Sequence, residues 1–204
     1  MFNCSVKYPV ILALIFILVN PLMAVCRITI LGDSLSTGVG VSAEQAWPML
    51  LSMNGHIVRN VSGAGNTSHD ALLLLQQNNQ KTDISIIAIG ANDALRGLPS
   101  SELEKNLEKI IDLLEGNNNQ VEILLITPQL PNNYPVKYRK TYNDTYEKLA
   151  KKHKIQIITI GYQEAIEHDL LSSDRLHPNA KGQQAIYNKV SRWLRQQQIC
   201  TLTP

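Results

Sequence analysis

The stretch Arg27-Ile28-Thr29-Ile30-Leu31-Gly32-Asp33-Ser34-Leu35 decides the fold, because an apolar run ends there at a glycine and a serine follows. The run is short and rich in isoleucine, which favours a buried strand over a helix. A serine hydroxyl becomes a useful nucleophile when a neighbouring base accepts its proton. We therefore predict a first strand over residues 27–31 that presents Ser34, a candidate nucleophile, at its carboxyl end.

Four further apolar runs follow, and helical patterns separate them. The five expected strands span residues 27–31, 57–61, 84–89, 122–126 and 155–160. They show little polar alternation, as strands buried on both faces do. Strands that alternate with helices predict an α/β domain with one parallel sheet, right-handed crossovers and helices on both sides. No linker or shift of composition divides the chain.

The helices between the strands have recognisable ends. Three starts resemble a capping box, in which a serine or threonine precedes an acid or amide by three residues. The pairs are Ser42 with Gln45, Thr67 with Asp70, which fits more loosely, and Ser101 with Glu104. The third of these helices should end at Gly116, and a last helix should open at Pro178-Asn179.

The first 24 residues have the layout of a secretory signal peptide. Lys7 is the only charge before Arg27, residues 10–19 (VILALIFILV) are uninterrupted apolar sequence, and Ala24 is a small residue suited to cleavage. Ten apolar residues are too few to span a bilayer, which needs about 20; a retained membrane anchor is the alternative. We expect an exported protein, periplasmic or secreted, with a signal peptide over residues 1–24 and a single domain over residues 25–204.

The composition excludes several classes of partner. Of the 204 residues, 44% are hydrophobic and 18% are charged, as in ordinary globular proteins. Cleavage after Ala24 removes Lys7 and leaves 18 basic residues against 17 acidic ones, a net charge of +1. A near-neutral chain gives no reason to expect a nucleic-acid partner. No cluster has metal-ligand spacing, so we expect no metal; we also expect no membrane span after cleavage, and a monomer.

Two cysteines, Cys26 and Cys200, remain after cleavage. Cys26 opens the first strand, and Cys200 follows the last helix. Helices of a parallel α/β sheet run back towards the strand starts, so both cysteines should lie at the same end. An even pair in an oxidising compartment can bridge. A disulfide and two free thiols are the open alternatives.

Three glycine-containing turns fall on one predicted edge of the sheet. In folds of this kind the site lies beyond the carboxyl ends of the strands. Residues 32–34, 63–65 and 90–92 follow the first three strands, and the loop after the fifth strand brings Asp174 and His177 to the same rim. The sequence therefore predicts one site at this edge.

These residues supply the parts of an acyl-transfer site. His177 is the candidate base for Ser34, and Asp174 can hold the tautomer of His177 and stabilise the imidazolium. A carbonyl under attack becomes an oxyanion, which needs preorganised neutral donors. The candidates are the backbone N–H groups of Ser34 and Gly65 and the side-chain amide of Asn92.

Competing patterns are weaker. Asp33 and Asp93 flank candidate residues, but we expect them to brace their loops. Four other histidines lack an acid at the right spacing and are interpreted as structural or solvated; they are His56, His69, His153 and His168. Residues 38–43 (GVGVSA) fit a dinucleotide fingerprint, but they do not follow the strand immediately and no acid lies about 20 residues on. We therefore expect no cofactor. No Gly-x-Ser-x-Gly elbow is present, which excludes an ordinary α/β-hydrolase.

Four ordered blocks resemble the SGNH (GDSL-type) hydrolases, and more narrowly the bacterial multifunctional thioesterase/lysophospholipase/arylesterase group. The blocks are residues 30–36 (ILGDSLS), 60–65 (NVSGAG), 90–97 (GANDALRG) and 174–179 (DRLHPN). The resemblance covers nearly all of the mature chain and implies a three-layer, flavodoxin-like α/β/α sandwich. It implies Ser34 as the nucleophile, Asp174 and His177 as the rest of the triad, and Gly65 and Asn92 in the oxyanion hole.

We therefore expect a serine-dependent hydrolase that cleaves acyl esters, acyl thioesters or lysophospholipids through an acyl-enzyme on Ser34. The loop over residues 95–99 and the turn Leu130-Pro131 are expected to wall an apolar acyl groove. A carbohydrate O-acetyl esterase of the same fold is one alternative, and a non-catalytic exported binding module with an inert Ser34 is another. Two departures from the group, Ala91 in place of a glycine and Asn66 in place of an acid, bear on substrate preference rather than on reaction type.

Overall fold

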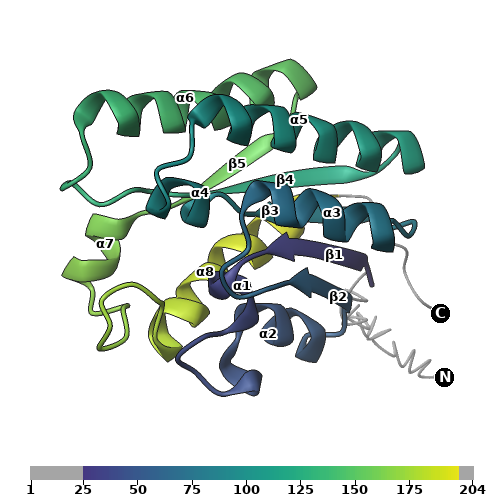
Figure 1. Cartoon of the computed structure of the whole chain (residues 1–204). Coiled ribbons are helices and arrows are strands. Elements are labelled where there is room, and N and C mark those ends of the chain that lie inside the picture. The colour runs from purple at the N-terminus through teal and green to yellow at the C-terminus, as the bar shows by residue number, and fades with distance from the viewer. Residues whose placement is uncertain (1–24, 198–204) are drawn as a thin grey trace, which may run out of the picture.

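A computed structural model describes residues 25–197, which form one parallel sheet with helices on both faces (Figure 1). The strands are β1 (Arg27–Gly32), β2 (Ile57–Ser62), β3 (Ile84–Ala88), β4 (Glu122–Pro128) and β5 (Gln156–Ile160). The helices are α1 (Ser34–Thr37), α2 (Trp47–Met53), α3 (Ser68–Asn78), α4 (Ala91–Leu95), α5 (Ser100–Asn117), α6 (Val136–His153), α7 (Tyr162–Glu167) and α8 (Ala180–Leu194), with a 3₁₀ turn η1 (Ala43–Gln45). All five predicted strands are present within two residues of their predicted ends.

The strands lie in the order β2-β1-β3-β4-β5, and all their pairings are parallel. This order puts β2 and β5 at the edges of the sheet. The prediction that every strand is buried on both faces is therefore right for β1, β3 and β4 but wrong for the two edge strands. In β2, Ile57 is 63% exposed, because an edge strand has a neighbour on one side only.

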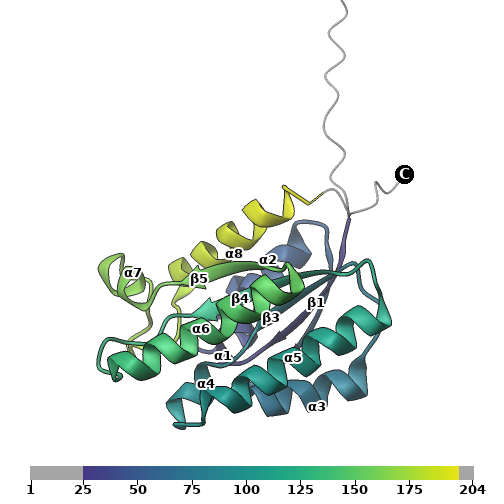
Figure 2. The same ribbon diagram turned by 90° about the horizontal axis from the view of Figure 1, so that it is seen from above.

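Two apolar cores lie on opposite faces of the sheet, and Figure 2 shows the three resulting layers. Helices α3, α5 and α6 pack on one face, against Ile87 of β3 and Leu125 of β4. Helices α2 and α8 pack on the other face, against Ile86 and Leu124. Successive side chains of a strand point to opposite faces, so each central strand contributes to both cores. The predicted three-layer α/β/α sandwich is confirmed.

Of the predicted capping boxes at the helix starts, one is well formed and another is wrong. The loosest predicted capping box is well formed: Thr67 N donates to Asp70 Oδ2 at 2.9 Å, and Asp70 N donates to Thr67 Oγ1 at 3.4 Å. The box at Ser101 is wrong, because α5 begins at Ser100 directly after Pro99 and has no side-chain cap. The fixed φ of a proline suits the start of a helix, which makes a capping side chain less necessary.

Two further helix ends differ from the prediction. Gln45 accepts a hydrogen bond from Ser42 N at 3.2 Å, but this pair closes only the single turn η1. The longer helix α2 begins at Trp47, with a proline in its first turn. Helix α5 runs one residue past Gly116. The last helix begins after Asn179, whose side chain accepts from Gly182 N, as predicted.

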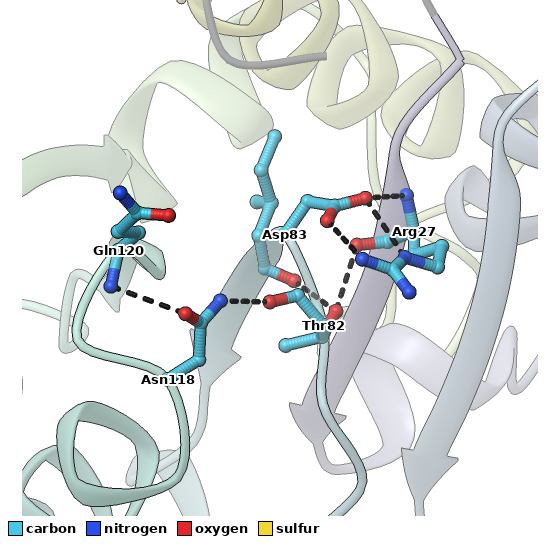
Figure 3. Close-up of polar contacts among 6 residues, drawn as sticks. Arg27, Thr82, Asp83, Asn118 and Gln120 are labelled. Carbon is cyan, nitrogen blue, oxygen red and sulfur yellow. Dashed lines mark hydrogen bonds and ion pairs between the residues drawn. The ribbon is translucent and has the colours of Figure 1, made fainter. Parts of the chain in front are cut away.

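A polar network fixes the edge of the sheet where the strands begin (Figure 3). Asp83 Oδ2 accepts from Arg27 N at 2.8 Å, and the Arg27 guanidinium bonds both oxygens of Asp83. Thr82 Oγ1 donates to the Arg27 carbonyl at 2.7 Å, and Asn118 Nδ2 donates to the Thr82 carbonyl at 2.8 Å. These contacts hold β1, β3 and the loop before β4 in register at the edge opposite the predicted site.

Some predictions fall on residues that are not described. The predicted signal peptide, residues 1–24, lies outside the described residues, and so does Cys200. Cys26 is buried and disulfide-bonded, but its pairing with Cys200 stays a prediction. No helix between residues 25 and 197 combines the length and the apolar character that crossing a bilayer requires.

Candidate active site

Ser34 is the first residue of α1, just after the sharp turn that follows β1. Figure 1 shows α1 at the edge where the strands end. Asp33 is the N-cap of α1, and its Oδ1 accepts from Leu35 N at 3.0 Å. A side chain at Gly32 would collide with the Ser36 hydroxyl. The glycine and the aspartate on either side of this turn therefore fix the direction in which Ser34 leaves the sheet.

A hydrogen-bonded relay joins Ser34, His177 and Asp174. His177 Nε2 lies 2.9 Å from Ser34 Oγ, and His177 Nδ1 lies 2.7 Å from Asp174 Oδ2. When the Nδ1 proton points to the carboxylate, the Nε2 lone pair faces the hydroxyl. Both distances are within the reach that activation of a serine requires. The structure thus brings together the three residues that the sequence singled out, across 143 positions of chain.

The turn that carries the base is organised by Asp174 itself. Asp174 Oδ1 accepts from Leu176 N at 2.9 Å and from His177 N at 3.0 Å, and Arg175 between them has a φ of 55°. The hydrogen bond from the His177 side chain, followed by these two backbone bonds, lowers the pKa of Asp174 to about 2. The carboxylate therefore stays ionised throughout the pH range in which an imidazole can act as a base.

Three candidate oxyanion donors line the same cavity as the Ser34 hydroxyl. Asn92 Nδ2 donates one of its hydrogens to the Asn66 carbonyl at 3.0 Å, which fixes the amide and leaves its second hydrogen available. Gly65 has a φ of 81°, a conformation that favours glycine. Among residues 25–197, no acceptor bonds the backbone N–H of Ser34 or of Gly65. These donors are available to a ligand.

Two buried tyrosines support the loop that carries Asn92. The Tyr146 hydroxyl lies 2.7 Å from the Ile89 carbonyl and 3.0 Å from the Tyr142 hydroxyl. Gly90, the N-cap of α4, has a φ of 120°, and a Cβ atom there would collide with the Tyr146 hydroxyl. The tyrosine pair therefore packs directly under the turn and sets the position of α4.

Asp33 and Asp93 hold loops together, as expected. Asp93 accepts from Ser68 N at 2.8 Å and from Ser68 Oγ at 2.5 Å, which joins α4 to the start of α3. Burial raises the pKa of Asp93. Burial also raises the pKa of Asp33 to about 6, since the hydrogen bond from Leu35 N and the charge of His177 offset only part of the desolvation. Asp33 Oδ2 has no partner among the described residues.

Two cavities meet at the site. The catalytic cavity, of about 300 Å³, is lined by Ser34, Asn92 and His177 among others. A narrow apolar channel of about 100 Å³ continues from it between the ends of β4 and β5 and helices α7 and α8. Four residues line both: Leu35, Ala91, Leu95 and Leu176. The predicted turn Leu130-Pro131 lines the channel, but Leu95 is the one residue of the loop 95–99 that does.

One group of possible metal ligands lies away from this site. Oxygen or nitrogen atoms of Asp112, Glu115 and His153 come within 4.8 Å of one another, at the C-terminal ends of α5 and α6. Sequence spacing did not suggest this cluster, because His153 comes from a different helix. None of the histidines other than His177 lines either cavity in the described part of the chain.

The sequence did not indicate two polar contacts of the site. Arg96 Nη2 donates to the Gly65 carbonyl at 2.7 Å. Gln183 is fully buried; its Oε1 accepts from Trp47 N at 3.0 Å, and its Nε2 donates to the Leu35 carbonyl at 3.4 Å. An amide on the apolar face of the last helix was the available signal for Gln183. Arg96 falls within the block of residues 90–97 and the expected groove loop, but nothing in the sequence indicated its contact with Gly65.

Comparison with known proteins agrees with this geometry. The sequence model of the GDSL-like Lipase/Acylhydrolase family matches residues 30–185. An arylesterase of Vibrio mimicus is 32% identical over 192 residues, 90% of this chain and 95% of that protein. The thioesterase 1/protease 1/lysophospholipase L1 of Escherichia coli strain K12 is 32% identical over 173 residues, 81% of each. The crystal structure of TesA superposes with a TM-score of 0.75 at 26% identity and covers 83% of this chain and 98% of that one. The chain therefore belongs to the GDSL-like lipase/acylhydrolase family, and it is a serine ester hydrolase of the SGNH type.

Proposed function

We propose that this enzyme hydrolyses carboxylic esters and thioesters through an acyl-enzyme on Ser34, with His177 as the base and Asp174 as its orienting carboxylate. The observation that carries the proposal is the unbroken relay from Ser34 Oγ through the imidazole to the carboxylate. A free serine hydroxyl is a weak nucleophile, and it gains reactivity when an oriented base accepts its proton.

The geometry supports a two-step reaction in which protons and bonds balance. His177 Nε2 accepts the Ser34 proton as Oγ attacks the acyl carbon, and the imidazolium then gives that proton to the departing alcohol or thiol. In the second step His177 accepts a proton from water, whose oxygen attacks the acyl-enzyme. Collapse of this intermediate releases the carboxylic acid and returns the proton to Ser34.

The oxyanion of both intermediates is stabilised by neutral donors. We assign this role to the backbone N–H groups of Ser34 and Gly65 and to the second hydrogen of Asn92 Nδ2. Because these groups are held in place before the reaction, they need no rearrangement as charge develops. The bond from Asn92 to the Asn66 carbonyl supports this assignment, since it fixes the amide at the cavity wall.

The apolar channel supports a substrate with an extended acyl chain. Each buried methylene contributes about 0.8 kcal/mol of transfer free energy, so a channel lined by residues such as Leu130, Ile160 and Ile186 favours longer chains than acetyl. The names of the relatives, an arylesterase and a thioesterase/lysophospholipase, fit this range of substrates. A carbohydrate O-acetyl esterase would need a short pocket and an open polar groove instead.

We also infer that the enzyme is exported, to the periplasm or beyond the cell, after removal of residues 1–24, and that residues 25–204 act as one domain. The support is the charge and apolar layout of those first residues. We infer that a monomer suffices for the reaction and needs no cofactor or metal, because the proposed nucleophile, base and oxyanion donors all belong to one chain.

The test is hydrolysis of p-nitrophenyl acetate and palmitoyl-CoA by the mature protein, together with labelling by a fluorophosphonate. Ser34→Ala should abolish both activities and the labelling. Ser52→Ala, which removes an exposed hydroxyl from α2, is the matched control and should behave like the wild type. Cleavage of the acetate alone would favour the deacetylase alternative. A wild-type Ser34 inert to the probe would refute the acyl-enzyme and favour a binding module.

A further inference from the structure

Arg96 is a cation beside the catalytic cavity to which the proposed mechanism gives no role. It follows α4 directly, and it is exposed. Its Nη2 donates to the carbonyl of Gly65 at 2.7 Å. The guanidinium therefore lies against the backbone of a residue that lines the cavity.

Most of the hydrogen-bonding capacity of Arg96 is unused. A guanidinium has five N–H donors in a planar fork, and within residues 25–197 only the Gly65 carbonyl accepts from it. No carboxylate in this part of the chain forms an ion pair with Arg96. The pKa of Asp70 is lowered chiefly by hydrogen bonds from Thr67 and only to a smaller extent by the charge of Arg96. Arg96 thus offers a free fork, which matches a carboxylate or phosphate group.

The acyl channel joins only part of the wall of the catalytic cavity. The walls that the cavity shares with the channel include Leu35 and Leu95, whereas Val39, Ala64 and Gly65 line the cavity alone. With the acyl chain in the channel, the alcohol or thiol has to leave through the unshared part of the cavity. Arg96 is not itself a lining residue of either cavity, but its bond to Gly65 puts the guanidinium next to the unshared part, where the leaving group would lie.

The distance from the reaction centre limits which anion Arg96 can reach. The oxyanion lies about 3 Å from the Gly65 N–H in the proposed mechanism, and Arg96 bonds the carbonyl of the same residue. One residue spans about 3.5 Å, so the guanidinium is within roughly 8–10 Å of the attacked carbon. In a 1-acylglycerol phosphate, the phosphorus is about six bonds from the acyl carbon, a reach of roughly 7–8 Å. In an acyl-CoA about fourteen bonds separate the two atoms, so an extended leaving group carries its phosphate past Arg96.

We propose that Arg96 forms a phosphate subsite for the leaving group, and that this residue makes the enzyme prefer acyl esters of glycerol phosphate over uncharged esters with the same acyl chain. This inference rests on the acyl-hydrolase function proposed above and adds to it a residue that selects among the expected substrates. The bond that breaks joins the acyl carbon to the glycerol oxygen, which keeps the electron pair and takes the proton from His177. Glycerol phosphate has left before water attacks, so Arg96 acts in acylation and has no part in deacylation.

The test compares three substrates below their micelle concentrations: 1-decanoylglycerol 3-phosphate, 1-decanoylglycerol and decanoyl-CoA. The first two share the acyl chain and the ester bond and differ only in the phosphate. Arg96→Gln should lower kcat/KM for the phosphate ester by about 10- to 100-fold, since a charge-assisted bidentate contact is lost. The other two substrates should change by less than about threefold, because neither has a phosphate within reach of Arg96.

Two further variants separate the effect of the Arg96 charge from that of its planar guanidinium, and both from the loss of any arginine. Arg96→Lys keeps the charge but lacks the planar fork, so it should retain only part of the preference for the phosphate ester. Arg192→Gln removes an exposed arginine from the last turn of α8 that lines neither cavity. It should keep the substrate ratios of the wild type.

Any other pattern of activities refutes either the phosphate subsite or the proposed function. An equal loss on all three substrates would mean that Arg96 only holds Gly65 in place, and would overturn the subsite. A loss confined to decanoyl-CoA would assign Arg96 to a distant phosphate and would overturn it as well. Hydrolysis of 1-decanoylglycerol by the wild type without any Arg96-dependent preference for the phosphate ester would refute this inference alone. Hydrolysis of none of the three would refute the proposed function together with it.

Discussion

Replacing Asn92 by alanine removes two hydrogen bonds that have different consequences. One hydrogen of Nδ2 bonds the Asn66 carbonyl at 3.0 Å, and we assign the other to the oxyanion. Loss of a side-chain oxyanion donor costs about 2.7–4 kcal/mol of transition-state stabilisation, or about 10²–10³ in kcat. Loss of the bond to Asn66 costs about 1 kcal/mol of folding free energy. Asn92→Ala should therefore lower kcat by about 10²–10³ while the protein stays folded.

The assay measures kcat and KM for p-nitrophenyl decanoate, with urea unfolding of the same preparation. Most of the loss should appear in kcat, because the oxyanion exists only after the carbonyl is attacked. Asn106→Ala is a matched control: Asn106 Nδ2 donates to Ser68 Oγ at 3.0 Å, and Asn106 lines neither cavity. It should lose similar stability but keep its kcat within about threefold.

Two results would contradict this reasoning. If kcat of Asn92→Ala falls by less than about threefold, the side-chain amide does not bind the oxyanion. If Asn106→Ala loses as much turnover as Asn92→Ala, the loss reflects a loosened α4 rather than a missing donor.

Three further predictions concern the turns around the site. Gly90→Ala should lower the free energy of unfolding in urea by roughly 2–4 kcal/mol, because the new Cβ atom collides with Tyr146 at a residue whose φ is 120°. Gly97→Ala is the control, because its Cβ atom meets nothing within 4 Å. A loss for Gly90→Ala no larger than that of Gly97→Ala would refute the packing argument. The folded pKa of Asp33 is raised from 3.8 to about 6, so the folded state holds the proton more tightly, and the free energy of unfolding should fall by roughly 2–3 kcal/mol as pH rises from 4 to 6. Asp33→Asn should remove that decline, and an unchanged slope between pH 4 and 6 would contradict it. Asp174→Asn keeps an acceptor for the turn but loses the charge that stabilises the imidazolium, so kcat should drop by about 10⁴, and a rate within tenfold of the wild type would exclude the orienting role.

Much of the fold could be predicted because its information is local. Each strand is an apolar run, and the alternation of strands with helices dictates a parallel sheet. The exposure of Ile57 could not be predicted, because it depends on β2 being an edge, and strand order is set by how the helices pack. The start of α5 was misplaced because Pro99 and Ser101 both suit a helix start, and the structure uses the proline.

The positions of the proposed catalytic groups could be predicted from the topology of the sheet. The side-chain contacts that hold those groups in place could not. Ser34, Asn92 and His177 each follow a strand or its connecting loop, so one rule about strand ends brings them to one edge. The hydroxyl of Tyr146 reaches the Ile89 carbonyl across 57 positions, and Gln183 reaches Trp47 across 136. Contacts of that kind depend on how two helices dock, and no short pattern in the sequence encodes them.

The 143 positions between Ser34 and His177 have a consequence for the order in which the protein is made. A ribosome delivers the nucleophile early and the base late, and His177 comes just before α8. The Gln183 side chain ties the first turns of that helix to the Leu35 carbonyl beside the nucleophile. A chain that is not yet synthesised as far as His177 therefore has the serine but lacks its base, and it cannot hydrolyse esters. The protein therefore gains hydrolytic activity only when the final helix docks. Until folding is complete, the enzyme is inactive in the cell that makes it.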